Sequence, residues 1–133
     1  MWTNGRVPAI APALNDGTIV ICDRFFDSTT VYQGVGRKLD PQAVAAINQF
    51  AVGAHLPDLT LVIDLDPRIG LDRVRGRELF DRMESQALEF YERVREGYLD
   101  LAKRENRRVK VVDGSQAIDV IAKQIWSLVN DVL

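Results

Sequence analysis

The sequence is poor in the residue types that form disulfides or bind transition metals. It contains one cysteine, Cys22, and one histidine, His55, in 133 residues. A single cysteine excludes the intramolecular disulfide framework that stabilises many small secreted proteins. Cys22 lies inside an apolar run, where a small buried hydrophobe is its expected role. This cysteine usage indicates a reducing compartment, and we expect the cytoplasm.

The chain also lacks a long apolar segment and an excess of charge of one sign. No stretch has the pattern of a signal peptide or a membrane span, so we expect no membrane association. The formal net charge of −2 argues against binding of a nucleic acid polymer, which requires a basic surface. With 47% apolar residues and no visible linker or repeat, residues 1–133 are predicted to form a single domain.

Apolar runs alternate with helical periodicity along the chain. The runs predict strands over residues 18–22, 59–65 and 108–112, with helices between them. This alternation is typical of an α/β protein with a parallel sheet.

Local signals predict where three helices begin or end. Asp40, followed by proline, predicts the start of a helix that Gly53 ends. A long second helix is predicted to begin at Asp81 or Ser85, and Ser115 is predicted to cap the last helix.

A charged pair, Asp23 and Arg24, follows the first apolar run. In open parallel α/β sheets, ligands bind beyond the carboxyl ends of the strands. Asp23 is therefore a candidate to hold a metal-bound water, and Arg24 a candidate to bind a phosphate. An ordinary turn with a surface ion pair is the alternative interpretation, and the pair alone leaves both open.

Residues 68–82 are rich in arginine. Five of the thirteen arginines of the chain lie there: Arg68, Arg73, Arg75, Arg77 and Arg82. Such a cluster can neutralise charge on a phosphoryl group during its transfer. It is also typical of a solvated helix face paired with acidic neighbours, and the residues alone favour that second interpretation.

A long part of the sequence is similar to a known family. The stretch DRFFDSTTVYQGVGRKLD (23–40) resembles the signature segment of bacterial thymidylate kinases, and the similarity continues through 56–65, 76–77, 81–84 and 111–113. The family's G-x-x-x-x-G-K-[ST] phosphate loop does not occur in these residues. The chain therefore resembles the C-terminal two-thirds of such an enzyme. The resemblance implies a partial P-loop-kinase-type parallel sheet covered by helices, without the first strands and the phosphate loop.

The resemblance implies an activity and its partners. The family transfers the γ-phosphate of ATP to thymidine monophosphate (dTMP), giving dTDP for dTTP synthesis, with Mg²⁺ and as a homodimer. Because a phosphate loop positions ATP, we expect these residues alone to be inactive. Two alternatives are a non-catalytic remnant or dimerisation module, and a kinase for another nucleoside or nucleotide.

The resemblance also implies roles for residues 23–33. Asp23 would assist magnesium coordination, and Arg24 would hold the phosphate of dTMP. Thr29 and Gln33 would contact the thymine, and Tyr32 would lie beside the deoxyribose. Ser28 would support this loop.

The arginine-rich segment, about residues 73–85, resembles the lid of bacterial thymidylate kinases. Arg77 is the best candidate for its catalytic arginine, and the further candidates are Arg73, Arg75 and Arg82. Asp81 and Glu84 would approach the acceptor nucleotide when the lid closes, or would form a helix capping box.

Two further expectations come from the resemblance. Asp113, Gly114 and Ser115 occupy the region where related kinases brace the adenine of ATP, although a Gly-Ser helix cap explains them equally well. In the family another strand lies between 18–22 and 59–65, so we expect these two strands either to pair directly or to be completed by a second chain.

Overall fold

The computed structural model describes residues 7–37, 39–53, 55–75 and 82–133. The chain forms two compact units, Met1–Leu56 and Pro57–Leu133. A single domain therefore stays a prediction. Among the described residues, no helix has the length and hydropathy that crossing a membrane requires.

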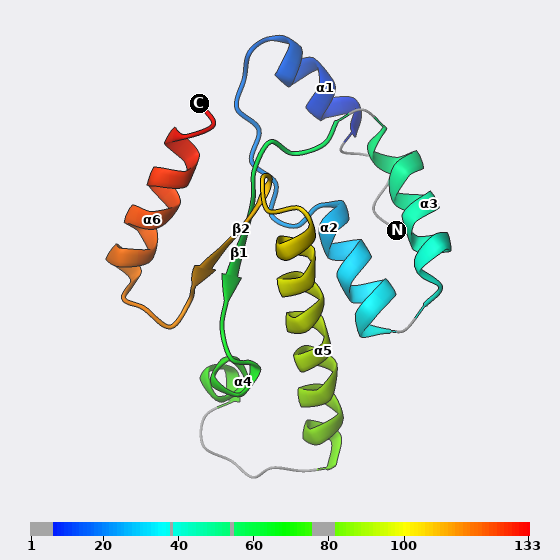
Figure 1. Cartoon of the computed structure of the whole chain (residues 1–133), viewed down its shortest axis with the longest axis vertical. Helices are drawn as coiled ribbons and strands as arrows, with labels where there is room; N and C mark the ends of the chain where they lie inside the picture. The colour runs from blue at the N-terminus through cyan, green and yellow to red at the C-terminus, as the bar shows by residue number, and fades with distance from the viewer. Residues whose placement is uncertain (1–6, 38, 54, 76–81) are drawn as a thin grey trace. The chain divides into compact units, whose positions relative to one another are not determined.

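The first unit is helical. Its elements are α1 (Val7–Asn15), α2 (Phe26–Thr29), η1 (Thr30–Gly36) and α3 (Pro41–Val52). α2 runs directly into η1, which is a π-helix, and α3 packs against both (Figure 1). We refer to the continuous helix of α2 and η1 as α2–η1.

The start and end of α3 confirm the local signals. The backbone N–H of Gln42 donates to Asp40 Oδ1 at 3.0 Å, as an N-cap does. Gly53, directly after the helix, has a φ angle of 56°, which glycine adopts without steric cost. The helix turns Val44 and Asn48 inward, while Ile47 is 58% exposed.

The second unit is an α/β structure. Its elements are β1 (Thr60–Asp64), α4 (Pro67–Arg75), α5 (Arg82–Arg104), β2 (Val109–Asp113) and α6 (Ile118–Asn130). β1 and β2 pair in parallel, with Thr60 opposite Val109 and Asp64 opposite Asp113. This confirms the strands predicted at 59–65 and 108–112. α5 and α6 lie on opposite sides of the two strands (Figure 1).

Valines of β2 and apolar residues of α5 form the core of the second unit. Val109 and Val112 are each 2% exposed, and Val94 and Leu101 of α5 are also buried. α5 packs against β2, and the β-branched residues of both strands suit this half-buried sheet. Because the strands are parallel and Asp64 lies opposite Asp113, both residues lie at the same edge of the sheet, where the two strands end.

The strand predicted at 18–22 is wrong. These residues have no regular secondary structure, and Ile19 and Ile21 are 63% and 90% exposed. A strand exists only through hydrogen bonds to a neighbouring strand, and the sheet of the described residues consists of β1 and β2. The direct pairing expected between 18–22 and 59–65 is therefore absent from it, and completion by a second chain stays a prediction.

The cap predicted at Ser115 is also wrong. α6 begins at Ile118 after Ala117, and no side chain caps it. The Ser115 hydroxyl instead donates to Asp113 Oδ1 at 2.6 Å. Because α6 begins three residues further along, its free N–H groups are not presented to the Ser115 hydroxyl oxygen, and the hydroxyl donates to the adjacent carboxylate instead. The long helix α5 begins at Arg82, as expected near Asp81, which lies outside the described residues.

Candidate functional site

Arg24 has a strained backbone. Its φ angle is 63°, and it is the one non-glycine residue with a positive φ among the described residues. This left-handed conformation costs roughly 1–2 kcal/mol for a residue with a Cβ, and such strain concentrates at functional sites. Arg24 Cζ lies 4.5 Å from the centre of the Tyr32 ring, within the range of a cation–π contact. The exposed guanidinium is therefore held over the helix that follows it.

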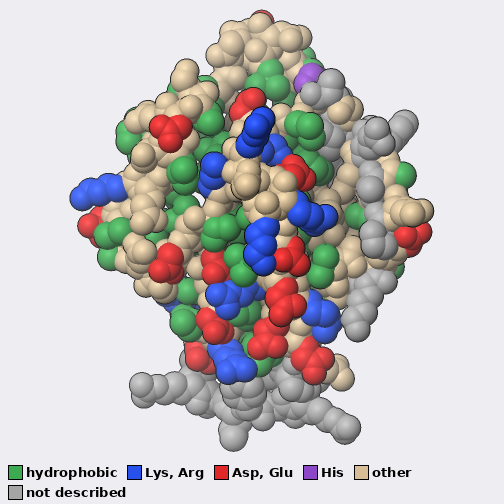
Figure 2. All heavy atoms as spheres, in the orientation of Figure 1, with side chains coloured by type: hydrophobic (Ala, Val, Ile, Leu, Met, Phe, Trp, Pro, Cys, Tyr) green, Lys and Arg blue, Asp and Glu red, His purple; other side chains and the backbone are tan. Residues whose placement is uncertain are grey.

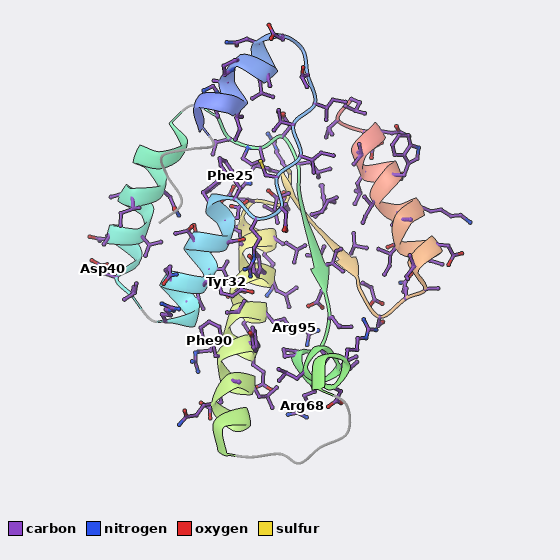
Figure 3. All side chains as sticks on the ribbon, turned by 180° about the vertical axis from the view of Figure 1, so that it is seen from behind. Phe25, Tyr32, Asp40, Arg68, Phe90 and Arg95 are labelled. Atoms are coloured by element: carbon purple, nitrogen blue, oxygen red, sulfur yellow. The ribbon has the colours of Figure 1, made fainter. Side chains whose placement is uncertain are left out.

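Four predicted substrate residues share one side of α2–η1. They lie at positions i, i+1, i+4 and i+5, which place side chains on one helix face; they are Ser28, Thr29, Tyr32 and Gln33, all partly exposed. Asp27 and Val31, on the other side, are 4% and 1% exposed. Since Arg24 lies over Tyr32, the helix brings the predicted phosphate-binding and nucleoside-binding residues together. Figure 3 labels Tyr32 on this helix.

The turn that carries Tyr32 and Gln33 is π-helical. The N–H of Arg37 donates to the carbonyl of Tyr32 at 3.0 Å, a span of five residues. π-Turns are rare and are frequently found at functional sites. The sequence did not predict this feature, because apolar periodicity reports the ordinary helical repeat.

Asn48 of α3 connects to the buried side of α2–η1, and the sequence analysis missed it. Its Nδ2 donates to Thr30 Oγ1 at 2.6 Å and lies 3.5 Å from the carbonyl of Phe26. The Thr30 hydroxyl donates in turn to the Phe26 carbonyl at 3.2 Å. Asn48 is 7% exposed, so its amide is buried, and the bonds it makes are partly buried. The available signal was a polar residue four positions after the buried Val44.

Asp23 is exposed, as a residue that meets a ligand from solution must be. The described residues hold no group of three or more potential metal ligands. Mg²⁺ is commonly held by one or two carboxylates together with substrate phosphates and water. One exposed carboxylate next to Arg24, the candidate phosphate ligand, therefore fits that mode of binding.

The arginine-rich segment is only partly described. Arg73 is an exposed residue of α4. Arg75 ends α4, and Arg82 and Glu84 lie in the first turn of α5, but their side chains are not described. Arg77 and Asp81 lie outside the described residues. The roles assigned to these residues stay predictions.

Arg68, at the start of α4, forms an exposed ion pair. Its Nη2 lies 3.6 Å from Glu92 Oε1 of α5. Lys, Arg, Asp and Glu side chains are interspersed over α5 on the face that Figure 2 shows. For Arg68 the structure thus supports the surface-face interpretation, since such exposed pairs contribute little.

Asp64 and Arg95 form a bidentate ion pair that sequence reasoning missed. Arg95 Nε donates to Asp64 Oδ1 at 2.7 Å, and Nη2 donates to Oδ2 at 2.8 Å. Arg95 is labelled in Figure 3. The hydrogen bonds to Asp64 raise the pKa of the Arg95 guanidinium above its usual value, and the charges of Asp64 and Asp66 add to this effect. The pair ties α5 to the carboxyl end of β1. An acidic residue at the end of an apolar run was the available signal for Asp64, as for Asp23.

Residues 113–115 form a turn at the same sheet edge. The Ser115 hydroxyl and backbone N–H both donate to Asp113 Oδ1. The hydroxyl bond is the main cause of a lowered pKa of the Asp113 carboxyl, and the Ser115 N–H and Gln116 amide add to it. Asp113 therefore stays ionised and engaged within its own turn.

Gly114 lies against the end of β1. Its N–H donates to the carbonyl of Asp64 at 2.7 Å. A Cβ at this position would be 2.8 Å from Ile63 Cγ2 and 2.9 Å from the Asp64 carbonyl oxygen.

We therefore expect Gly114→Ala to lower the free energy of unfolding by about 1–3 kcal/mol, because the backbone oxygen cannot move without breaking the turn. Urea unfolding followed by circular dichroism measures the change. Gly70→Ala is the matched control, since a Cβ at Gly70 of α4 meets nothing within 4 Å. Equal stability of Gly114→Ala and the unsubstituted protein would contradict the steric argument.

Comparison with known proteins identifies the family of this chain. The thymidylate kinase family model matches residues 5–125. A thymidylate kinase of Symbiobacterium thermophilum is 51% identical over 124 residues, covering 93% of this chain and 58% of the relative. Those of Ligilactobacillus salivarius and Maridesulfovibrio salexigens are 41% and 48% identical over 127 and 123 residues, covering 94% and 87% of this chain and 61% and 57% of the relatives.

The chain thus spans about three-fifths of the length of these relatives. The match nevertheless includes residues of both units, among them Arg24, α2–η1 and the 113–115 turn, and it accounts for the α/β structure with a small parallel sheet. The chain belongs to the thymidylate kinase family.

Proposed function

We propose that the protein to which these residues belong transfers the γ-phosphate of ATP to dTMP and gives dTDP. The observation that carries this proposal is the arrangement of Arg24, strained in φ and held over Tyr32, beside a helix face with Ser28, Thr29 and Gln33. A fixed arginine is suited to a phosphate, because its planar guanidinium binds two oxygens at once. The adjacent hydroxyl and amide groups are suited to a nucleoside.

Within this proposal each residue has a distinct task. Arg24 holds the phosphate of dTMP, and Thr29 and Gln33 contact the thymine. Tyr32 lies beside the sugar, where its ring disfavours a 2′-hydroxyl, while Ser28 supports the loop. Asp23 holds Mg²⁺, which when bound neutralises charge on the phosphates.

The second unit supplies the remaining proposed roles. Asp113, Gly114 and Ser115 brace the adenine of ATP, and Asp81 and Glu84 approach the acceptor when the lid closes. The lid arginines neutralise charge on the transferring phosphoryl group, where positioning and electrostatics provide most of the catalysis; they are Arg77 first, then Arg73, Arg75 and Arg82. We also propose a homodimer in the cytoplasm.

Titration calorimetry with nucleoside monophosphates tests the proposed substrate. We expect dTMP to bind, and dCMP, dGMP and the 5′-monophosphate of ribothymidine to bind at least about tenfold more weakly, since the helix face is built for one base and a deoxy sugar. A preference for another monophosphate would favour a different nucleotide kinase. No binding of any monophosphate would favour a non-catalytic module.

A further inference from the structure

We propose that Asn48 is a positioning residue for nucleoside recognition, because its hydrogen bond to Thr30 sets the rotation of α2–η1 about its axis. This inference rests on the proposed function, since it assumes that the helix face with Thr29, Tyr32 and Gln33 meets the nucleoside. Asn48 itself touches none of these side chains in the bonds described above. It acts through the opposite face of the same helix.

The position of the contact supports this role. Thr30 is the first residue of η1, and its hydroxyl both accepts from Asn48 and donates to the Phe26 carbonyl one turn earlier. The bond from α3 therefore meets α2–η1 at the point where the helix changes from α to π geometry. Thr29 directly precedes this point, and Tyr32 and Gln33 follow it.

Burial gives the contact its specificity. Asn48 is 7% exposed and Val31, next to Thr30, is 1% exposed. Burial of apolar side chains such as Val31 and Val44 favours contact between α3 and η1 but not one rotation, because dispersion is non-directional. A hydrogen bond requires a set distance and angle, and a buried amide without its partner is costly. The Asn48–Thr30 bond therefore selects one rotation of the helix.

Two substitutions remove this bond with little change in volume. Asn48→Leu removes the donor, and Thr30→Val replaces the acceptor hydroxyl by a methyl group. Thr30→Ser keeps the hydroxyl and serves as the conservative variant. Val44→Ala is the matched control, because it removes packing from a buried residue of the same helix, one turn earlier, and leaves the bond in place.

The test compares base discrimination, measured as the ratio of the Kd values of dCMP and dTMP. We expect Asn48→Leu and Thr30→Val to lower this ratio about tenfold, the effect of about one misplaced hydrogen bond in the site. Thr30→Ser and Val44→Ala should keep the ratio of the unsubstituted protein, even where Val44→Ala lowers the Tm. A loss of stability alone does not change a ratio of two affinities measured on folded protein.

An unchanged ratio in both folded variants would overturn the proposal. If Asn48→Leu does not fold, Thr30→Val decides the matter alone. If the unsubstituted protein binds no dTMP, the proposed function fails, and amide hydrogen exchange then tests the positioning. In that case Thr30→Val must speed exchange at residues 29–33 more than Val44→Ala does, and equal rates would refute a positioning role for Asn48.

Discussion

A protein consisting of residues 1–133 alone is expected to show no phosphorylation of dTMP above background. In the kinase reaction the enzyme contributes mainly the positioning of ATP and acceptor and the neutralisation of charge. Positioning alone supplies roughly 7–11 kcal/mol of such a barrier. These residues contain no G-x-x-x-x-G-K-[ST] loop to hold the phosphates of ATP, so we expect turnover at least about 10⁵-fold below that of a complete thymidylate kinase.

A coupled assay with ATP, Mg²⁺ and dTMP measures this turnover, and the intact mass establishes which chain is present. The thymidylate kinase of Symbiobacterium thermophilum is a suitable positive control, and the Arg24→Ala variant detects contaminating host kinase. Turnover by a protein of the mass of 133 residues that disappears in Arg24→Ala would contradict the prediction. It would mean that ATP is held without a phosphate loop.

Replacing Arg24 is expected to have the largest effect on dTMP binding. Arg24→Ala and Arg24→Gly should each raise the Kd of dTMP about 100-fold, since each loses a charge-assisted, two-point contact with the phosphate. Arg24→Lys should raise it about tenfold, because an ammonium keeps the charge but not the planar pair of donors. Titration calorimetry measures all three.

The alanine and glycine variants also separate charge from backbone strain. Both remove the guanidinium, but only glycine adopts a φ near 63° without cost. The free energy of unfolding of Arg24→Gly should therefore be about 1 kcal/mol higher than that of Arg24→Ala. The two variants should bind dTMP equally weakly. A Kd of dTMP that stays unchanged in both variants would remove Arg24 from the phosphate site.

Several elements were predictable because their causes are local. The cap of Asp40 and the positive φ of Gly53 define α3, and β-branched runs define β1 and β2. Each of these features depends on residues only a few positions apart. Ser28, Thr29, Tyr32 and Gln33 were named from the family resemblance as part of a loop, and the structure places them on a helix instead.

The failed predictions depended on which hydrogen-bond partner the folded chain makes available. Residues 18–22 have strand composition, but a strand needs a neighbour for its backbone groups. Ser115 has the identity of a helix cap, but the Asp113 carboxylate engages its hydroxyl. Composition describes what a segment prefers and does not show which partner is available.

The sequence by itself determined the family, the start and end of α3 and the positions of β1 and β2, and it named the candidate residues of the phosphate and nucleoside site. Only the tertiary structure decided that Arg24 adopts a left-handed backbone over Tyr32, that Asn48 bonds Thr30 across 18 residues, and that Arg95 binds Asp64 across 31. The physical reason is the range of the interactions. Propensity, capping and periodicity act along the chain, whereas these contacts form only when folding brings distant side chains within hydrogen-bonding or cation–π distance.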